Sequence, residues 1–467
     1  MPRPFLVRYA GLAGTLLLAV AAWYGGATNP WEPTVTPRTI LAGRDGVLLP
    51  LAWLFGTALL IGAWWAGRRV VPSTRWAYVT AGLWALPLLP FLPLGSYDVY
   101  SYACQGWQQA AGSDPYAGGV DLLGCPWADA VAPTWRDAPA PYGPVFLVLA
   151  AAAAKLGGSL TGTVALLRLI AVLGVVVIGW CLPVLARRRG VPPERAVWLV
   201  LACPLVPIHL ISGAHNEAVM IALLLAGLTV AVTGAGVRRM LLAGVLLGLA
   251  VGVKATAVVV LPFAVLIFGR KTAAVVVGGG AAAALAAVSF GSGLGLGWVT
   301  GLAGSGVSVQ WTALPTAIGL TLELIGVDGA VGVTRVVGMV ALVVVLIALW
   351  VFTLGNGKDP VLYAGLALAA TVVLAPVFHP WYALWPLAVL AATVRRETLW
   401  LVVPCAVAAA LCLPDGYNLA LASRAQGAVV MTVLAGYLAW KVLHEANRDS
   451  RRLGAAHGGD RGPRRDP

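Results

Sequence analysis

Long apolar segments recur along the chain, separated by short polar connections. Each is about 17 to 25 residues long, which lets a helix cross a bilayer core of about 30 Å while satisfying its own backbone hydrogen bonds. The pattern predicts an all-α polytopic membrane protein with about 12 to 14 transmembrane helices in one domain, residues 1–442. The expected spans are 5–25, 47–67, 76–93, 163–186, 196–211, 217–235, 241–269 (long enough for a hairpin of two short helices), 272–290, 332–354, 361–377, 380–394, 398–414 and 425–442.

Composition and charge place this domain in the membrane. Hydrophobic residues make up 60% of the 467 residues and charged residues only 10%, which excludes a soluble domain of this size. Most of the net charge of +13 lies in short connections between spans, and these connections fall on one side of the membrane. By the positive-inside rule that side is the cytoplasm, and both termini lie there. The charge therefore reflects topology and anionic lipid, not nucleic acid, and 443–467 is expected to be a disordered basic tail.

The remaining polar chemistry gathers on the outer face. The outer connections are 26–46, the long loop 94–143, and shorter segments near 213–218, 291–331, 378–381 and 414–418. The apolar segment 144–160 is interpreted as re-entrant or interfacial, because a full crossing would invert the charge rule further along. A transporter is expected to carry ionisable residues near the bilayer midplane, whereas here they lie at one face. An enzyme acting on a membrane-embedded substrate fits this pattern better.

Several segments carry a resemblance to a known family. They are SYDVYSYACQGW and AGSDPYA (96–107 and 111–117), WADAVAPTWRDAPAPYGPVF (127–146), ISGAHNEA (211–218) and VFHPWYALW (377–385). Together they resemble the polyprenol-phosphate-mannose-dependent α-1,6-mannosyltransferases, membrane enzymes of the GT-C type, over about residues 76–440. The resemblance implies a long outer catalytic loop, a polyprenyl-phosphate-mannose donor, a growing mannan or lipomannan-type glycolipid acceptor and no cofactor. A different polyprenyl-phosphate sugar, such as arabinose or glucose, or a lipid-linked-sugar flippase are the alternatives.

Asp98 is the expected catalytic residue. In the resembled enzymes an acidic residue in the first large outer loop, next to the end of a transmembrane helix, is catalytic, and Asp98 occupies that place. A β-linked donor and an α-linked product require inversion, for which one carboxylate acts as the base toward the acceptor hydroxyl. The alternative is that Asp98 only caps the interfacial helix that follows it.

Further residues are expected to bind substrate or phosphate. His215, Asn216 and Glu217 stand at an outer helix start, where an N-cap and the helix dipole offer a purely structural explanation. Arg335 and Arg424 violate the charge rule, so one or both are predicted to contact the donor phosphate. Lys254 lies in an apolar hairpin and is predicted to contribute to this contact if the hairpin tip reaches the outer half of the membrane; for all three the alternative is simple snorkelling. No metal-ligand spacing appears, although Asp98, His215 and Glu217 could converge on one ion.

Aromatic rings and His379 complete the predicted substrate site, with an interfacial belt as the alternative explanation. These residues are Tyr97, Tyr100, His379, Trp381 and Tyr382.

Two of the six cysteines, Cys104 and Cys125, lie outside the apolar runs, both in the loop 94–143. The outer compartment is oxidising, so a disulfide that closes the loop is predicted, with two unpaired thiols as the alternative. Such a bridge requires the two Cα atoms to lie within about 7 Å.

Overall fold

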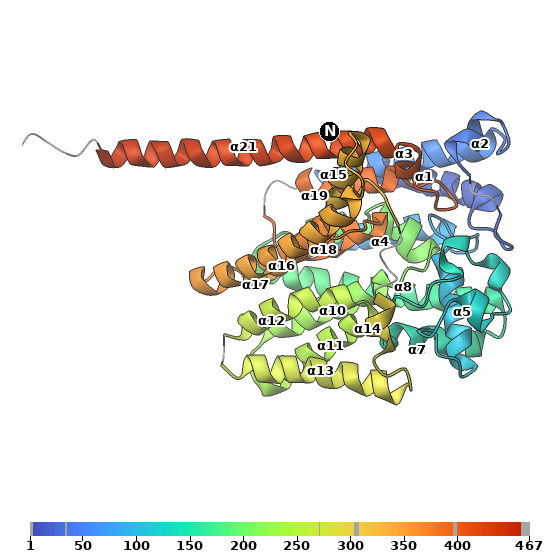
Figure 1. Ribbon diagram of the computed structural model, residues 1–467, viewed down its shortest axis with the longest axis horizontal. Helices are drawn as coiled ribbons and strands as arrows, with labels where there is room; N and C mark the ends of the chain where they lie inside the picture. Colours follow the sequence, from blue (N-terminus) through green and yellow to red (C-terminus); the bar gives the residue numbers. More distant parts are fainter. Residues whose placement is uncertain (1–2, 33–34, 270, 303–307, 396–398, 459–467) are drawn as a thin grey trace, which may run out of the picture.

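The computed structural model describes the whole chain except residues 1–2, 33–34, 270, 303–307, 396–398 and 459–467. Over the described residues it is a bundle of α-helices without a β-strand; a single isolated bridge joins Cys412 and Asn418. Many helices run roughly parallel to one another, and α2, α5 and α7 gather at one end of the bundle (Figure 1). The predicted all-α class is therefore confirmed.

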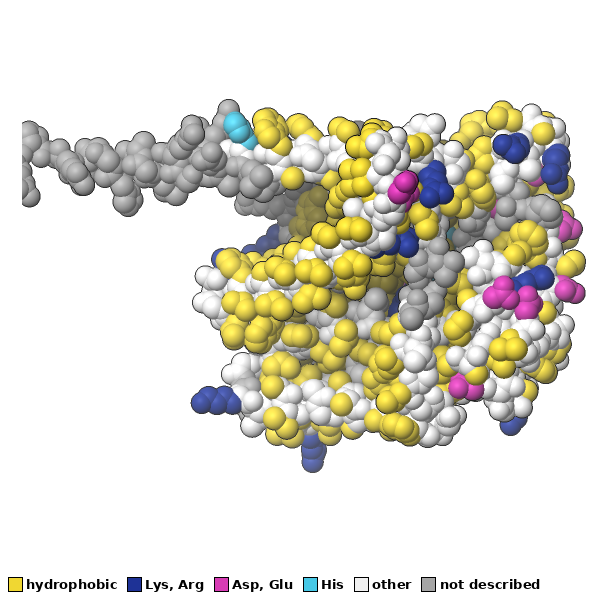
Figure 2. All heavy atoms as spheres, in the orientation of Figure 1, with side chains coloured by type: hydrophobic (Ala, Val, Ile, Leu, Met, Phe, Trp, Pro, Cys, Tyr) yellow, Lys and Arg dark blue, Asp and Glu magenta, His cyan; other side chains and the backbone are white. Residues whose placement is uncertain are grey.

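Five helices are long and apolar enough to cross a membrane within the part of the chain that the structure describes. They show broad apolar surfaces, for example on α16, where Val333 and Val336 are each 65% exposed, as expected for residues that face lipid (Figure 2). The chain is an all-α polytopic membrane protein. The five are α1 (Pro4–Gly25), α3 (Leu48–Gly67), α8 (Leu160–Arg189), α13 (Ala273–Gly291) and α16 (Ala330–Asn356).

Of the other predicted spans, 425–442 lies within the long helix α21 (Arg424–Gly458), and the rest are shorter or broken, so helix length alone does not decide the predicted total of about 12 to 14 spans. Residues 196–211 do not form one straight helix: α9 (Pro193–Leu201) and the π-helix η4 (Val206–Ser212) meet at a 65° bend. Shorter helices cover the remaining segments: α4 (Thr74–Ala85), α10 (Glu217–Thr233), α11 (Val237–Val253), α12 (Leu261–Phe268), α17 (Pro360–Leu374), α18 (Leu384–Leu390) and α19 (Leu399–Ala410).

The structure differs from the sequence prediction at two further places. The segment 291–331, expected as a connection, contains the apolar helix α15 (Leu314–Leu324), which packs on α16 and α21. Helix α21 (Arg424–Gly458) continues into the segment predicted to be a disordered tail, since residues such as Ala, Leu, Lys and Arg favour helix there. The segment 144–160 forms the 14-residue helix α7 (Pro144–Gly157), and its re-entrant or interfacial placement stays a prediction.

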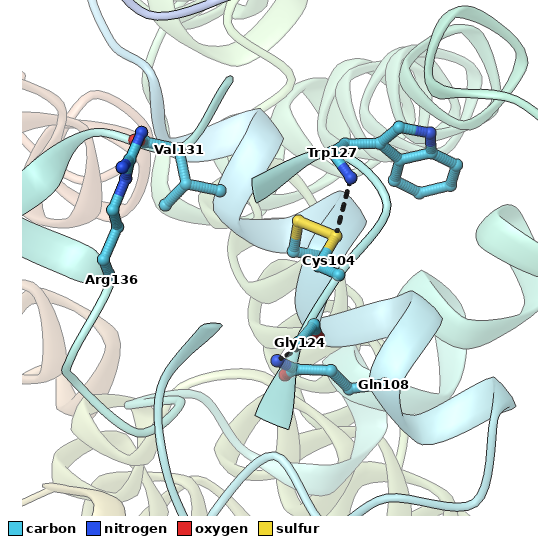
Figure 3. Close-up of a disulfide and its surroundings, with 7 residues drawn as sticks. Cys104, Gln108, Gly124, Trp127, Val131 and Arg136 are labelled. Carbon is cyan, nitrogen blue, oxygen red and sulfur yellow. Dashed lines mark hydrogen bonds between the residues drawn. A yellow bond between two sulfur atoms is a disulfide. The ribbon is translucent and has the colours of Figure 1, made fainter. Parts of the chain in front are cut away.

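The long loop 94–143 is built around one helix, α5 (Asp98–Ala110), which packs tightly on α7. Gly106 permits that contact, since a Cβ there would lie 2.3 Å from the carbonyl oxygen of Ala150. A disulfide joins Cys104 of α5 to Cys125, with their Cα atoms 5.5 Å apart (Figure 3). The predicted bridge is thus confirmed. It fastens the middle of the loop to the helix that begins with Asp98.

The predicted hairpin within 241–269 brings Lys254 to the α5 end of the bundle. Helix α11 ends at Val253, and a short 3₁₀ segment, η5 (Ala255–Val260), leads into α12. Helix α11 packs closely on α13. Gly248 permits this contact, because a Cβ at that position would lie 2.3 Å from the Ala281 carbonyl oxygen. The backbone nitrogen of Gly143, which precedes α7, donates to the Val253 carbonyl at 3.1 Å, so the hairpin tip is joined to the loop that carries α5.

Candidate active site

A cavity of about 530 Å³ lies between the start of α5 and the tip of the hairpin. Aromatic rings and a few polar groups line its inner part, and α16 and α17 supply apolar side chains, among them Met339, Leu342 and Val372. Five residues that the sequence singled out meet here: Asp98, Lys254, His379, Trp381 and Tyr382. Four other rings join them: Tyr102, Trp135, Tyr142 and Trp385.

Asp98 is the first residue of α5, and its carboxylate borders the cavity with 12% of the side chain exposed. Its backbone nitrogen donates to Ser96 Oγ at 3.0 Å, which fixes the start of the helix. Tyr97 occupies the N-cap position, and no side-chain hydrogen bond caps this end. The Asp98 carboxylate is therefore not engaged as the N-cap, and it remains available to a molecule in the cavity.

His215 lies between two carboxylates. Its Nδ1 is 3.8 Å from Asp98 Oδ2 and 3.6 Å from Glu217 Oε2, and Tyr102 Oη approaches the same nitrogen at 3.3 Å. The imidazole is fully buried, so its orientation is set by packing rather than by solvent. From this position Nδ1 can orient either carboxylate, and with it the face that Asp98 presents to the cavity.

Glu217 and Lys254 form a buried ion pair behind the cavity wall. The Lys254 ammonium donates to Glu217 Oε1; the carboxylate has no exposed surface, whereas 13% of the lysine side chain is exposed. The same ammonium lies 4.4 Å from the ring centre of Tyr382 and 5.1 Å from that of Trp385, within the range of cation–π attraction. Glu217 is thus paired with the lysine and has no contact with the cavity, whereas part of the Lys254 side chain lines the cavity.

Stacked rings form one wall of the cavity. His379 lies parallel to Trp381 with ring centres 4.9 Å apart, and the ring of His215 also lies close to that of Trp381, with centres 3.9 Å apart. Tyr382 stacks on Trp385 at 4.2 Å. Desolvation lowers the pKa of His379 to about 4, so the ring is neutral at pH 7. A wall of flat, largely uncharged rings suits the apolar face of a sugar.

The remaining predicted site residues do not line this cavity. Tyr97, which precedes α5, contacts Thr28 through its hydroxyl. Tyr100, on another face of α5, donates its hydroxyl to the Ala27 carbonyl at 2.7 Å. Asn216 is buried behind the wall, and neither its amide oxygen nor its nitrogen has a partner among the described residues.

The two arginines predicted to bind phosphate do not line the cavity. Arg335 donates to Thr316 Oγ1 at 3.0 Å and to the Ser308 carbonyl at 2.6 Å, about one helical turn from the cavity residue Met339. Arg424 is exposed at the start of α21, a helix that contributes no residue to the cavity wall.

One neighbour of the site, His209, was missed in the sequence. It lies in the π-helix η4 with no exposed surface, its ring centre 5.8 Å from that of His215 and 5.2 Å from that of Trp381. Neither ring nitrogen has a partner among the described residues. Pro204 and Pro207 beside it are the available signal, since proline inside an apolar run marks a break in a helix, and π-helical turns are frequent at functional sites.

The described residues contain no group of three or more His, Cys, Asp or Glu side chains arranged to hold a metal ion. Asp98 and Glu217 do converge on His215, but both approach the same nitrogen, and Lys254 occupies one oxygen of Glu217. The cluster is therefore organised as a chain of polar contacts from Asp98 to Lys254.

The fold and this cavity define a polytopic membrane enzyme, with a buried carboxylate at the edge of an aromatic-lined cavity. Residues 8–270 match the family described as α-(1→6)-mannopyranosyltransferase, N-terminal domain, and residues 310–444 match the family described as MptB C-terminal domain. The chain belongs to the α-(1→6)-mannopyranosyltransferase family and is a glycosyltransferase of the mannosyltransferase class.

Curated relatives agree with this assignment. An α-(1→6)-mannopyranosyltransferase A of Mycobacterium tuberculosis is 31% identical, covering 82% of this chain and 79% of its own length. A probable α-(1→6)-mannopyranosyltransferase of Mycolicibacterium smegmatis is 32% identical, with 83% and 79% covered. An α-(1→6)-mannopyranosyltransferase B of Corynebacterium glutamicum is 31% identical, with 84% and 73% covered. No solved structure matches the chain.

Proposed function

We propose that the protein transfers mannose from polyprenyl-phosphate-mannose to a growing mannan or lipomannan-type glycolipid, forming an α-(1→6) linkage with inversion at the outer face of the membrane. The observation that carries this proposal is the cavity itself, which brings the Asp98 carboxylate and the Lys254 ammonium to one apolar space. The names of the relatives support mannose and the α-(1→6) linkage. The charge distribution of the sequence supports the outward orientation.

Asp98 acts as the base. The acceptor hydroxyl attacks the anomeric carbon on the face opposite the phosphate, its proton passes to Asp98, and the bond between that carbon and the phosphate oxygen breaks with its electron pair leaving on the phosphate. His215 Nδ1 orients the carboxylate. Trp381 and His379 offer flat faces to the sugars, as the sequence suggested.

Lys254 receives the leaving phosphate. Its ammonium already balances the charge of Glu217, so the added attraction comes from its cavity-facing side, close to where the negative charge of the leaving group develops. Met339 and Leu342 on α16 give the polyprenyl chain an apolar path toward lipid. Arg335 stays a prediction as a phosphate contact, placed further out than Lys254, and so does Arg424.

The test is an assay in membranes with labelled polyprenyl-phosphate-mannose and an α-1,6-oligomannoside acceptor, followed by linkage analysis of the product. Asp98→Asn keeps the size of the side chain but cannot take the proton, so turnover should fall about 10²-fold or more while donor binding is retained. Asp98→Glu keeps a base displaced by one methylene and should be impaired less. Asp137→Asn, an exposed carboxylate of the same loop, is the matched control.

Three outcomes would contradict the proposal. Full activity of Asp98→Asn would remove the catalytic role. Transfer of arabinose or glucose but not mannose from the corresponding lipid phosphates would identify another donor. Movement of the lipid-linked sugar across the membrane without transfer, unaffected by Asp98→Asn, would indicate a flippase.

A further inference from the structure

A second cavity, of about 950 Å³, lies on the other side of α5. Tyr100 lines it, whereas Asp98 and Tyr102 line the first cavity, in keeping with about 100° of rotation per residue along a helix. Its walls come from the end of α1, the segment 89–93 that precedes α5, and the first half of α8. Nothing in the proposed transfer reaction uses this cavity.

One wall of this second cavity is apolar and opens toward lipid. Trp23 at the end of α1 is 69% exposed and Leu169 on α8 is 51% exposed, as expected for side chains that contact acyl chains. The other wall is polar, with Thr28 and Asn29 in the connection after α1 and the exposed carboxylate Glu32 at its edge. The cavity therefore has an apolar side and a polar side, like a lipid next to its head group.

Arg168 supplies a cation to this cavity from within a membrane-spanning helix. Its Nη1 donates to the Leu89 carbonyl at 2.8 Å and its Nε to the Ser212 carbonyl at 3.0 Å. Its third nitrogen, Nη2, is buried and has no hydrogen-bond partner among the described residues. No carboxylate forms an ion pair with Arg168 in the described part of the chain. A guanidinium in a spanning segment is costly, and two carbonyl bonds leave its charge uncompensated.

We infer that this second cavity binds a membrane lipid with an anionic, phosphate-bearing head group. The phosphate neutralises Arg168, a residue suited to phosphate by charge and geometry, and the acyl chains lie along Leu169 and its apolar neighbours. Thr28, Asn29 and Glu32 contact the polar part of the head group. A purely structural Arg168, which only ties two carbonyls together, would leave the cavity without a preferred lipid.

The same arginine connects this lipid site to the candidate active site. Leu89 precedes the segment that leads to Asp98, and Ser212 precedes His215. Ser212 also accepts a hydrogen bond through its Oγ from the Leu94 nitrogen, at 3.1 Å. A lipid phosphate that holds Arg168 therefore also steadies both segments that carry the catalytic cluster.

The test measures lipid retention directly and so does not depend on the transfer reaction. The purified protein is loaded in detergent with phosphatidylglycerol or phosphatidylcholine, exchanged into lipid-free detergent, and analysed by native mass spectrometry. Ala165→Trp and Thr161→Trp fill the cavity from exposed positions of α8 and leave Arg168 intact. Leu173→Trp is the matched control, because it is 55% exposed on the same helix outside the cavity.

The wild type and Leu173→Trp should retain phosphatidylglycerol in preference to phosphatidylcholine. Retention should fall about tenfold or more in both cavity-filling variants and in Arg168→Gln, a loss of about 1.4 kcal/mol or more in binding. Excess inorganic phosphate should not displace the lipid. The inference is overturned if the filled variants retain phosphatidylglycerol like the control, if the two lipids are retained equally, or if inorganic phosphate displaces the lipid and so identifies a site for free anions.

Discussion

Removing the lysine of the Glu217–Lys254 pair should cost far more stability than removing both charges. In Lys254→Met the Glu217 carboxylate stays in a place with no solvent exposure and loses the cation that balances it. Breaking a buried pair on one side typically costs about 3 to 5 kcal/mol, because the remaining charge is neither paired nor hydrated. His215 is the one other polar group near that carboxylate, at 3.6 Å, among the contacts described for it.

The two partners are not equivalent. In Glu217→Gln the lysine keeps its cation–π contacts with Tyr382 and Trp385 and its 13% exposure on the cavity, so the loss should be smaller, about 1 to 3 kcal/mol. The double variant Lys254→Met/Glu217→Gln buries no charge at this position. Replacing a whole buried pair is often close to neutral, so the double variant should be more stable than Lys254→Met alone.

Equilibrium unfolding in mixed detergent and dodecyl sulfate micelles gives the four free energies of the double-mutant cycle. We expect a coupling energy of about 2 kcal/mol or more between the two positions. Lys155→Met, which removes an exposed lysine of α7, should change the stability by less than about 0.5 kcal/mol. Additive costs for the two single variants would refute the assignment of a strongly coupled buried pair.

Two further predictions concern the loops at the same end of the molecule. Cys104→Ser/Cys125→Ser should lower the free energy of unfolding by about 2 to 4 kcal/mol, and a reductant should lower the melting temperature of the wild type but not of this variant; equal sensitivity to reductant would contradict the bridge. Burial raises the pKa of Asp415 to about 6 from 3.8, so the folded state binds its proton more tightly and stability should fall as pH rises from about 4 to 6, by at most about 3 kcal/mol. Melting temperatures of Asp415→Asn should lack this fall, and a pH dependence identical to that of the wild type would show that another group causes it.

Features written locally in the sequence could be predicted. Asp98 stands at the junction of an apolar run and a polar, aromatic loop, and the structure places it at the cavity. Cys104 and Cys125 are distinguished from the other cysteines by the segments around them, and they are bridged. The long spans follow from the length of their apolar runs, because the lipid core sets a minimum length for a crossing helix.

Features created by contacts between distant segments could not be predicted. Glu217 and Lys254 are 37 residues apart on different helices, so nothing local marks one as the partner of the other. His209 lies in an apolar run whose pattern predicts one straight span. Only the packing around the bend after α9 brings it beside His215. Arg168 was not recognised as a site residue, because it lies inside a predicted span and a single cation barely changes the mean hydropathy of a thirty-residue helix.

The ion pair also bears on how the protein is assembled in the membrane. With the proposed orientation, the hairpin α11–η5–α12 has to carry Lys254 through the hydrocarbon to reach the outer side during biogenesis. Glu217 lies at the start of the preceding helix, α10, and is therefore synthesised first. A lysine inserted beside an acid already in place avoids part of the cost of an isolated charge in lipid. Helices α10 to α12 are then expected to enter the bilayer as one cooperative unit, with Glu217 guiding the hairpin that follows it.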